Sequence, residues 1–290
     1  QIPTDRKPVV TFRLSDDSGQ GLDKDGKLTP GTVSLGIILA YIPQGQTQYV
    51  DYSTRVQTSP ITGVSATQAA TDSGGVYTSR GDGTYDYQFR TVLPANYDTT
   101  VTHTLGIYAS RNLAAFGLSR YVDNQVYNFV PNGAKVTTIR EVAITASCNQ
   151  CHDPLMAHGE TGRQNVEICI LCHTPQTVDP DTGNTVDMKV MVHKIHRGSS
   201  LPSVLAGKPY QIIGFNQSVA DYSTVAFPQD IRNCDTCHNA PPNSKTQPAQ
   251  MNNWFLNPTR ATCGSCHDDI DWTTGKNHVG GPATSDRSCD

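Results

Sequence analysis

The chain contains 290 residues, of which 36% are hydrophobic and 17% are charged, with 24 glycines and 18 prolines. This composition indicates a turn-rich folded protein and excludes a disordered one, and no apolar run is long enough for a membrane-spanning helix. Residues 1–147 hold 12 basic and 12 acidic side chains, so the net charge of −4 falls entirely in residues 148–290, which argues against a nucleic-acid partner.

Residues 1–138 are predicted to form a mainly β domain. Apolar and polar side chains alternate in residues 9–14, 85–90 and 101–107, as in strands that bury one face. The apolar run 33–42 fits a buried strand, and the Gly, Asp and Pro residues between these segments supply turns. Short strands at this spacing predict a β-sandwich or a small barrel.

His103 is the one histidine of this first domain. It lies within an alternating segment, so we interpret it as a strand residue rather than a ligand. The domain shows no Ser/His/Asp grouping, phosphate-binding loop or paired acids that would support chemistry. We therefore expect a scaffold or a docking module.

Residues 139–290 are predicted to form a loop-rich, sparsely helical domain, which holds all nine cysteines. Its dominant feature is Cys-x-x-Cys-His, which occurs four times. Two cysteines at this spacing can each form a thioether with one vinyl group of a haem, and the adjacent histidine then ligates the iron. A zinc ribbon or a redox dithiol would not need that histidine. The expected cofactors are four covalently attached haem c groups, with thioethers at Cys148, Cys151, Cys169, Cys172, Cys234, Cys237, Cys263 and Cys266 and proximal iron ligands His152, His173, His238 and His267.

Four further histidines of the second domain lie outside the motifs, one for each expected haem. Every iron therefore has a candidate sixth ligand, and we expect bis-histidine coordination. The candidate distal ligands are His158, His193, His196 and His278. Methionine is the competing sixth ligand, although packing is the expected role of Met156, Met188, Met191 and Met251. The assignment of distal ligands to individual haems is left open.

Residues 188–196 are predicted to form a helix that begins near Asp187. His193 and His196 lie three residues apart, hence on one face, where they can ligate two different haems. The preceding segment, 179–187, carries alternating oxygen-bearing side chains and allows a calcium site. It lacks the Asp/Asn–Gly pair and the terminal Glu of a calcium loop, so the alternative is an acidic surface turn that caps the helix.

Cys289 has no unpaired partner for a disulfide. We interpret Ser288-Cys289-Asp290 as the start of a fifth Cys-x-x-Cys-His, and we expect truncation there and a fifth haem in a longer chain. A free thiol is the alternative. Haem is attached to this motif outside the cytoplasm, so we expect an exported protein that was processed before Gln1.

An iron with two protein ligands has no position open for a substrate. Such haems exchange electrons but do not transform a small molecule, so the sequence predicts an electron carrier rather than an enzyme. One alternative is a multihaem reductase of the nitrite or hydroxylamine type with one open haem. Another is a β domain that binds a surface or a partner while the haems are secondary. Whether the carrier acts as a terminal metal reductase is left open.

Long segments of the chain resemble the OmcA/MtrC family of outer-membrane multihaem cytochromes. The resemblance is strongest in residues 147–159, 169–175, 179–202, 223–238 and 263–281, and it is weaker in residues 9–19 and 81–89. It implies an N-terminal split β-barrel or Greek-key sandwich followed by a pentahaem domain with bis-histidine ligation, in which the four distal candidates occupy ligand positions.

The resemblance also implies where the protein acts and with what. It implies a location on the extracellular side of the outer membrane, with the periplasm as the alternative. The implied partners are other multihaem cytochromes or an outer-membrane electron conduit, with metal oxides or flavins as acceptors, and self-assembly is a further expectation. Family members usually continue into a second β domain and a second pentahaem group, so the resemblance suggests a fragment, a proteolysed product or a naturally short member.

Overall fold

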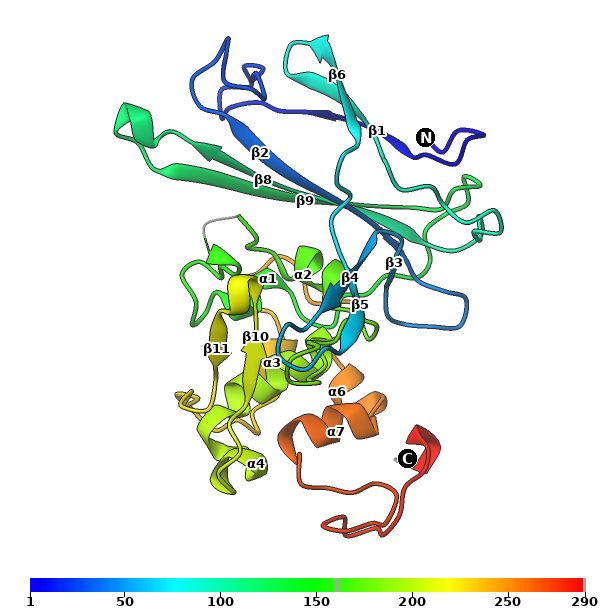
Figure 1. Ribbon diagram of the computed structural model, residues 1–290, viewed down its shortest axis with the longest axis vertical. Helices are drawn as coiled ribbons and strands as arrows, with labels where there is room; N and C mark the ends of the chain where they lie inside the picture. The colour runs from blue at the N-terminus through cyan, green and yellow to red at the C-terminus, as the bar shows by residue number, and fades with distance from the viewer. Residues whose placement is uncertain (160–161, 289–290) are drawn as a thin grey trace. The chain divides into compact units, whose positions relative to one another are not determined.

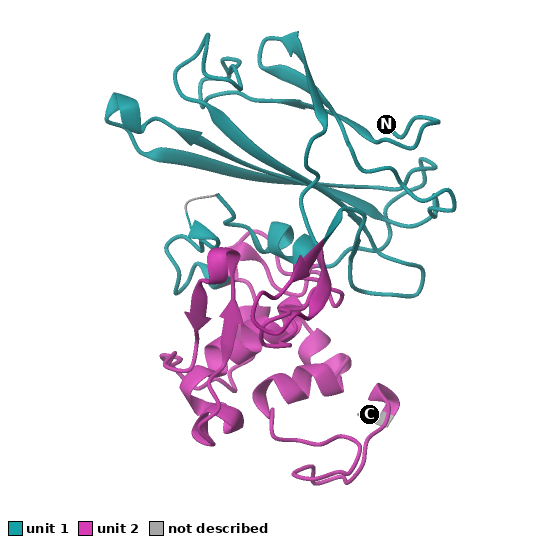
Figure 2. Ribbon diagram, viewed as in Figure 1, with its two compact units in different colours: residues 1–55, 69–140, 148–172 teal, residues 56–68, 141–147, 173–290 magenta. Residues whose placement is uncertain are grey.

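The structure is a computed structural model that describes residues 1–159 and 162–288 (Figure 1). The chain divides into two compact units, shown in Figure 2. Unit 1 contains residues 1–55, 69–140 and 148–172, and unit 2 contains residues 56–68, 141–147 and 173–290. The domain division predicted at residues 138/139 stays a prediction. Among the described residues, no helix is both long and apolar enough to cross a membrane.

Unit 1 is built from two antiparallel sheets, as the alternating segments predicted. One sheet has the order β1-β7-β6 and the other the order β3-β2-β8-β9. The long central pairing joins β2 to β8, from Val33 opposite Arg111 to Tyr41 opposite His103. The strands are β1 (Val9–Arg13), β2 (Val33–Tyr41), β3 (Val50–Asp51), β6 (Val76–Gly81), β7 (Thr84–Gln88), β8 (His103–Asn112) and β9 (Arg120–Phe129), and the short helix η1 is Ala114–Phe116.

Strand β2 carries a continuous apolar run because both of its faces are buried. Ile37 and Leu39 point into a cluster with Tyr87, Phe89 and Leu93. Ile38 and Ala40 face the opposite cluster, which contains residues of helix α2 (Val166–Cys172). Since α2 includes two cysteines of the second motif, this candidate haem-attachment site packs directly on the β-sheet core.

His103 is a buried strand residue, as predicted, and none of its surface is exposed. Its Nε2 lies 2.8 Å from the Tyr52 hydroxyl, and its Nδ1 lies 3.1 Å from the carbonyl oxygen of Val101. Burial lowers the pKa of His103, so the ring stays neutral. Its nitrogens are thus occupied by protein groups.

Unit 2 is sparsely helical and rich in loops, again as predicted. The longest helix among its described residues, α3, has ten residues, and most of the others make a single turn. Its helices are α1 (Thr145–Cys148, which ends in unit 1), α3 (Met188–Arg197), η3 (Gly198–Ser200), α4 (Pro202–Leu205), η4 (Phe215–Gln217), α5 (Asp235–His238), α6 (Asn253–Leu256), α7 (Arg260–Cys266) and η5 (Asp286–Ser288). Its strands form the hairpins β4–β5 (Thr54–Thr58, which starts in unit 1, and Ser65–Ala69) and β10–β11 (Gln211–Ile213 and Val219–Asp221).

The acidic segment 179–187 is a hydrogen-bonded turn. Asp179 is buried, with 2% of its surface exposed, whereas Thr182 and Gly183 at the tip of the turn are exposed. The buried carboxylate accepts hydrogen bonds from the backbone of Asp181 and Ile213 and from the Thr182 hydroxyl. Protein donors therefore occupy this carboxylate, and the described residues include no cluster of three or more His, Cys, Asp or Glu that could hold a metal ion. Asp187 caps α3 by accepting from Lys189 N, as predicted.

Candidate haem-binding centre

Each Cys-x-x-Cys-His motif forms one turn of helix. In the first, third and fourth motifs, the backbone N–H of the motif histidine donates a hydrogen bond of 3.0 Å to the carbonyl oxygen of the first cysteine. The two cysteines of the second motif lie in the last turn of helix α2. Residues three apart in a helix share one face, so both thiols of a motif point to the same side. This geometry suits two thioethers to one haem edge.

The thiols of the second motif do not have the properties of a redox dithiol. The eight cysteines of the four motifs form no disulfide among the described residues, and Cys289 lies outside those residues. Burial raises the pKa of the Cys169 thiol to about 11 and that of the Cys172 thiol to about 12. Reactive dithiols need a lowered thiol pKa. The buried second motif thus fits covalent attachment better than thiol exchange.

Four of the candidate ligands hold their rings in the tautomer that iron requires. Nδ1 of His173 lies 2.9 Å from the Val186 carbonyl oxygen, and Nδ1 of His278 lies 2.6 Å from that of Gly281. On α3, Nδ1 of His193 and of His196 contact the carbonyl oxygens four residues earlier. A carbonyl oxygen only accepts, so Nδ1 carries the proton and Nε2 keeps its lone pair for a metal.

The rings of His193 and His238 lie near each other in unit 2. Their centroids are 6.3 Å apart, and their planes make an angle of 20°. Two imidazoles on opposite sides of one metal ion, each with a metal–nitrogen bond of about 2 Å, have ring centres about 6 Å apart. The separation of these two ring centres therefore matches that of two ligands of one iron. His238 belongs to the third motif, and His193 comes from α3.

Burial lowers the pKa of both rings in this pair. For His193 the desolvation of the imidazole is the main cause, and for His238 it is desolvation followed by the proximity of His193. Both effects favour the neutral imidazole, which is the form that binds a metal. Nδ1 of His238 is itself buried, and a backbone hydrogen bond with Val142 works against these two effects.

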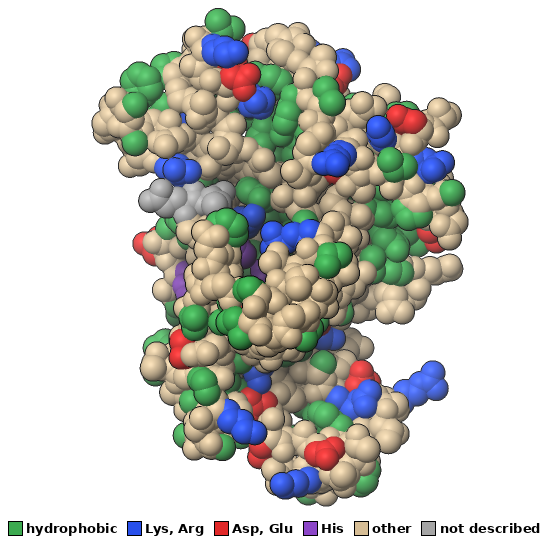
Figure 3. Space-filling view, in the orientation of Figure 1, with side chains coloured by type: hydrophobic (Ala, Val, Ile, Leu, Met, Phe, Trp, Pro, Cys, Tyr) green, Lys and Arg blue, Asp and Glu red, His purple; other side chains and the backbone are tan. Residues whose placement is uncertain are grey.

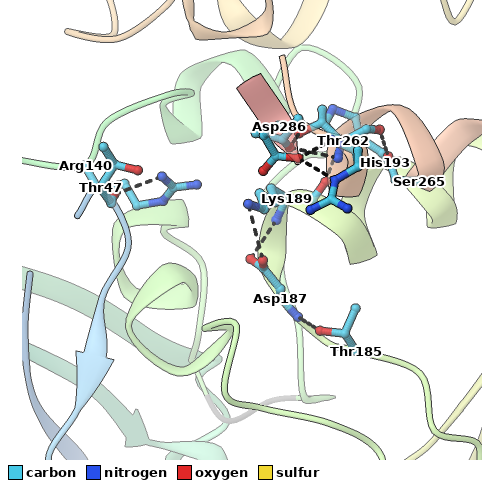
Figure 4. A network of polar contacts seen from close by, with 11 residues as sticks. Thr47, Arg140, Thr185, Asp187, Lys189, His193, Thr262, Ser265 and Asp286 are labelled. Atoms are coloured by element: carbon cyan, nitrogen blue, oxygen red, sulfur yellow. Dashed lines mark hydrogen bonds and ion pairs between the residues drawn. The ribbon is translucent and has the colours of Figure 1, made fainter. Parts of the chain in front are cut away.

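Helix α3 is positioned by contacts at its start and along its length. Figure 4 shows Asp187 between Thr185 and Lys189 at the start of α3, and His193 lies one turn further along this helix. Helix α3 packs against α7. The helix that carries two distal candidates thus lies on the helix that carries the fourth haem motif.

Trp272 packs between the fourth motif and His278. A Cβ at Gly264, which lies between the two motif cysteines, would be 3.3 Å from the Trp272 ring nitrogen. The ring centroid of Trp272 lies 5.0 Å from that of His278, in an edge-on arrangement. The indole therefore fills the gap between two candidate haem-binding groups.

The remaining candidates lie at the surface. His152 and His158 are exposed in the segment 148–159 of unit 1, and His267 is exposed directly after α7. Sequence reasoning missed the carbonyl groups that fix the imidazole tautomers. Every residue carries a carbonyl, so no sequence signal could have identified those of Val186 and Gly281.

Comparison with known proteins places this arrangement in a family. Residues 140–288, just over half of the chain, match the family described as outer membrane cytochrome MtrC/MtrF-like, domains II/IV. The multiheme cytochrome MtrC of Shewanella baltica (strain OS185) is 27% identical over 211 residues, which are 70% of this chain and 27% of that protein.

Two solved structures share the fold. The outer membrane decaheme cytochrome OmcA superposes with a TM-score of 0.69 at 23% identity, over 91% of this chain and 42% of that one. MtrC from Shewanella baltica OS185 gives a TM-score of 0.62 at 23% identity, over 99% of this chain and 41% of that one. The chain thus spans less than half the length of these relatives.

The fold and the repeated motif define a multihaem c-type cytochrome with an N-terminal β-sheet region. More specifically, the chain belongs to the MtrC/MtrF-like family of outer membrane cytochromes, and it matches domains II/IV of that family. The resemblance found in the sequence is confirmed.

Proposed function

We propose that this chain is an extracellular electron carrier, which passes electrons along four bis-histidine haem c groups to metal oxides, flavins or partner cytochromes. The observation that carries this proposal is the pairing of His193 with His238, whose separation and neutral rings fit one six-coordinate iron. In this proposal the third haem has His238 as its proximal ligand and His193 as its distal ligand.

The other haems use the remaining motif residues and distal candidates. Thioethers form at the cysteine pairs 148/151, 169/172, 234/237 and 263/266, with proximal ligands His152, His173, His238 and His267. The distal ligands of the other three haems are His158, His196 and His278. The carbonyl contacts of His173, His196 and His278 support these roles, because each leaves Nε2 available to a metal.

Closed coordination favours conduction over catalysis. When two protein nitrogens occupy both axial positions of an iron, a substrate has to displace one of them before it can bind. The chain therefore acts as an electron carrier and not as an enzyme of the nitrite or hydroxylamine reductase type. Direct reduction of a metal oxide at an exposed haem edge remains compatible with this scheme, since it needs no open axial position.

We place the carrier at the extracellular side of the outer membrane. Membership of the outer membrane cytochrome family supports this location, with the periplasm as the alternative. Its proposed partners are other multihaem cytochromes or an outer-membrane electron conduit, and self-assembly with further copies of the chain is part of the proposal. Figure 3 shows both basic and acidic side chains on the drawn face of the molecule.

Intact mass and a haem stain of the exported protein test the proposal. The expected mass is that of the polypeptide with one haem for each of the four motifs, and the expected electron paramagnetic resonance spectrum of the oxidised protein is entirely low-spin. A polypeptide without covalent haem, or a stoichiometric high-spin signal, would overturn the proposal. The interpretation of Cys289 as the start of a fifth motif stays a prediction, which the mass of a longer chain addresses.

A further inference from the structure

A buried ion pair lies between the helix of distal ligands and the fourth haem motif. Lys194 Nζ and Asp268 Oδ2 are 2.6 Å apart, with 15% and 9% of their side chains exposed. Lys194 lies on α3 between His193 and His196, and Asp268 directly follows His267. Both residues belong to unit 2.

Further contacts hold the two charges in place. Asp268 also accepts hydrogen bonds from Ser203, with the amide 2.9 Å from Oδ1 and the hydroxyl 2.6 Å from Oδ2. Lys194 Nζ lies 5.0 Å from the ring centroid of Tyr210, which adds a cation–π contact. The ammonium and the carboxylate are therefore fixed, not merely close.

A buried ion pair of this kind calls for an explanation beyond stability. The desolvation of two charges often costs as much free energy as their attraction contributes. A protein with an apolar pair of similar volume in the same place is therefore often equally stable. What an apolar pair cannot reproduce is the effect of each charge on its neighbours, which is far stronger inside the protein than in water. The neighbours here are candidate iron ligands on both sides.

We propose that the Lys194–Asp268 pair tunes the reduction potential of the fourth haem, the one held by Cys263, Cys266 and His267. This inference rests on the proposed function, because it requires haem at the fourth motif. An oxidised haem carries one more positive charge than a reduced haem. An uncompensated carboxylate nearby therefore favours oxidation, and an uncompensated ammonium favours reduction. In the native protein the two charges offset each other, so the potential reflects their balance.

The test is a double-mutant cycle on the haem-loaded protein, followed by spectroscopic redox titration. Lys194→Met leaves the carboxylate unbalanced and is expected to lower the potential of one haem. Asp268→Asn leaves the ammonium unbalanced and is expected to raise it. The double variant is expected to return toward the native value, and Lys194→Arg, which keeps the charge, to stay close to it.

The exposed pair Arg232–Asp230 supplies the matched control. Arg232 lies two residues before Cys234 of the third motif, but 86% of its side chain and 43% of that of Asp230 are exposed. Water and salt screen such charges. Arg232→Met is therefore expected to shift a potential several-fold less than Lys194→Met does.

Equal-sign shifts in the two single variants, or no shift in either, would overturn the tuning role. If Lys194→Met does not fold, the raised potential expected for Asp268→Asn and the unchanged potential expected for Lys194→Arg still decide the matter. Intact mass and the low-spin spectrum, recorded on every sample, separate the two proposals. Missing haem in the native protein refutes the proposed function, whereas four low-spin haems with unchanged potentials refute only the role of the ion pair.

Discussion

Replacement of Leu171 by alanine should weaken the whole of unit 1, because this side chain ties a haem-attachment helix to the β core. Leu171 is 0% exposed and packs with Ile38 and Tyr108. A Cβ at Gly106 of β8 would lie 2.5 Å from Leu171 Cδ1. Glycine has no side chain with which to fill the vacated space, so the site can collapse only a little.

The expected cost follows from these contacts. Three carbon atoms lose their burial, which costs about 2.4 kcal/mol at roughly 0.8 kcal/mol per methylene. The cavity left against Gly106 adds to that loss, and Leu→Ala substitutions in cores cost about 2–5 kcal/mol in total. We expect a value of about 4 kcal/mol, in the upper part of that range.

Urea unfolding of the haem-loaded protein, followed by far-ultraviolet circular dichroism, measures this cost. Leu118→Ala is the control, since Leu118 is 51% exposed in the same unit and should change the free energy of unfolding by about 0.5 kcal/mol or less. A loss under about 1 kcal/mol for Leu171→Ala would refute the packing of α2 on the sheet.

Three further predictions address the packing, the charges and the ligands. Gly106→Val should destabilise unit 1 by about 1–3 kcal/mol in the same unfolding assay, because its side chain would collide with Leu171 and Ile168; an unchanged midpoint would contradict the close approach. Asp72→Ala should cost about 2–4 kcal/mol, since this carboxylate accepts from Tyr87 Oη, Arg90 N and both donors of Thr91. Burial alone would raise the pKa of Asp72, but the hydrogen bonds from Thr91 and Tyr87 outweigh burial and lower the pKa below its usual value. The contribution of Asp72 to the free energy of unfolding is therefore fully present above about pH 4 and is lost as pH falls through the folded-state pKa. A pH series in which Asp72→Ala shows the same acid slope as the native protein would contradict this. His193→Ala should turn one haem high-spin and leave the others low-spin in the oxidised protein, whereas four unchanged low-spin signals would show that His193 is not a ligand.

The parts of this protein that short-range chemistry determines were predictable from its sequence. Cys-x-x-Cys-His places two thiols and an imidazole within one helical turn, so spacing alone indicates haem attachment. The alternation in β8 and the apolar run of β2 predicted strands, because the side-chain period of a strand is local. Capping of α3 by Asp187 followed in the same way.

Features that depend on distant residues were not predictable. Residues 56–68 belong to unit 2 because Ser59, Thr62 and Gln68 bond to the segment 178–181, more than a hundred positions away in sequence. Lys194 and Asp268 are 74 residues apart in the sequence, and no pattern in either segment predicts that they form an ion pair. The pairing of His193 with His238 likewise emerges only when α3 and the third motif are folded together.

The most direct test of closed, bis-histidine haems is the visible spectrum of the reduced native protein before and after carbon monoxide is added. If two histidines ligate every iron, as proposed, carbon monoxide finds no open position, and the spectrum is expected not to change. Formation of a carbon monoxide adduct at a native haem would contradict the account, and would favour an enzyme with an open iron.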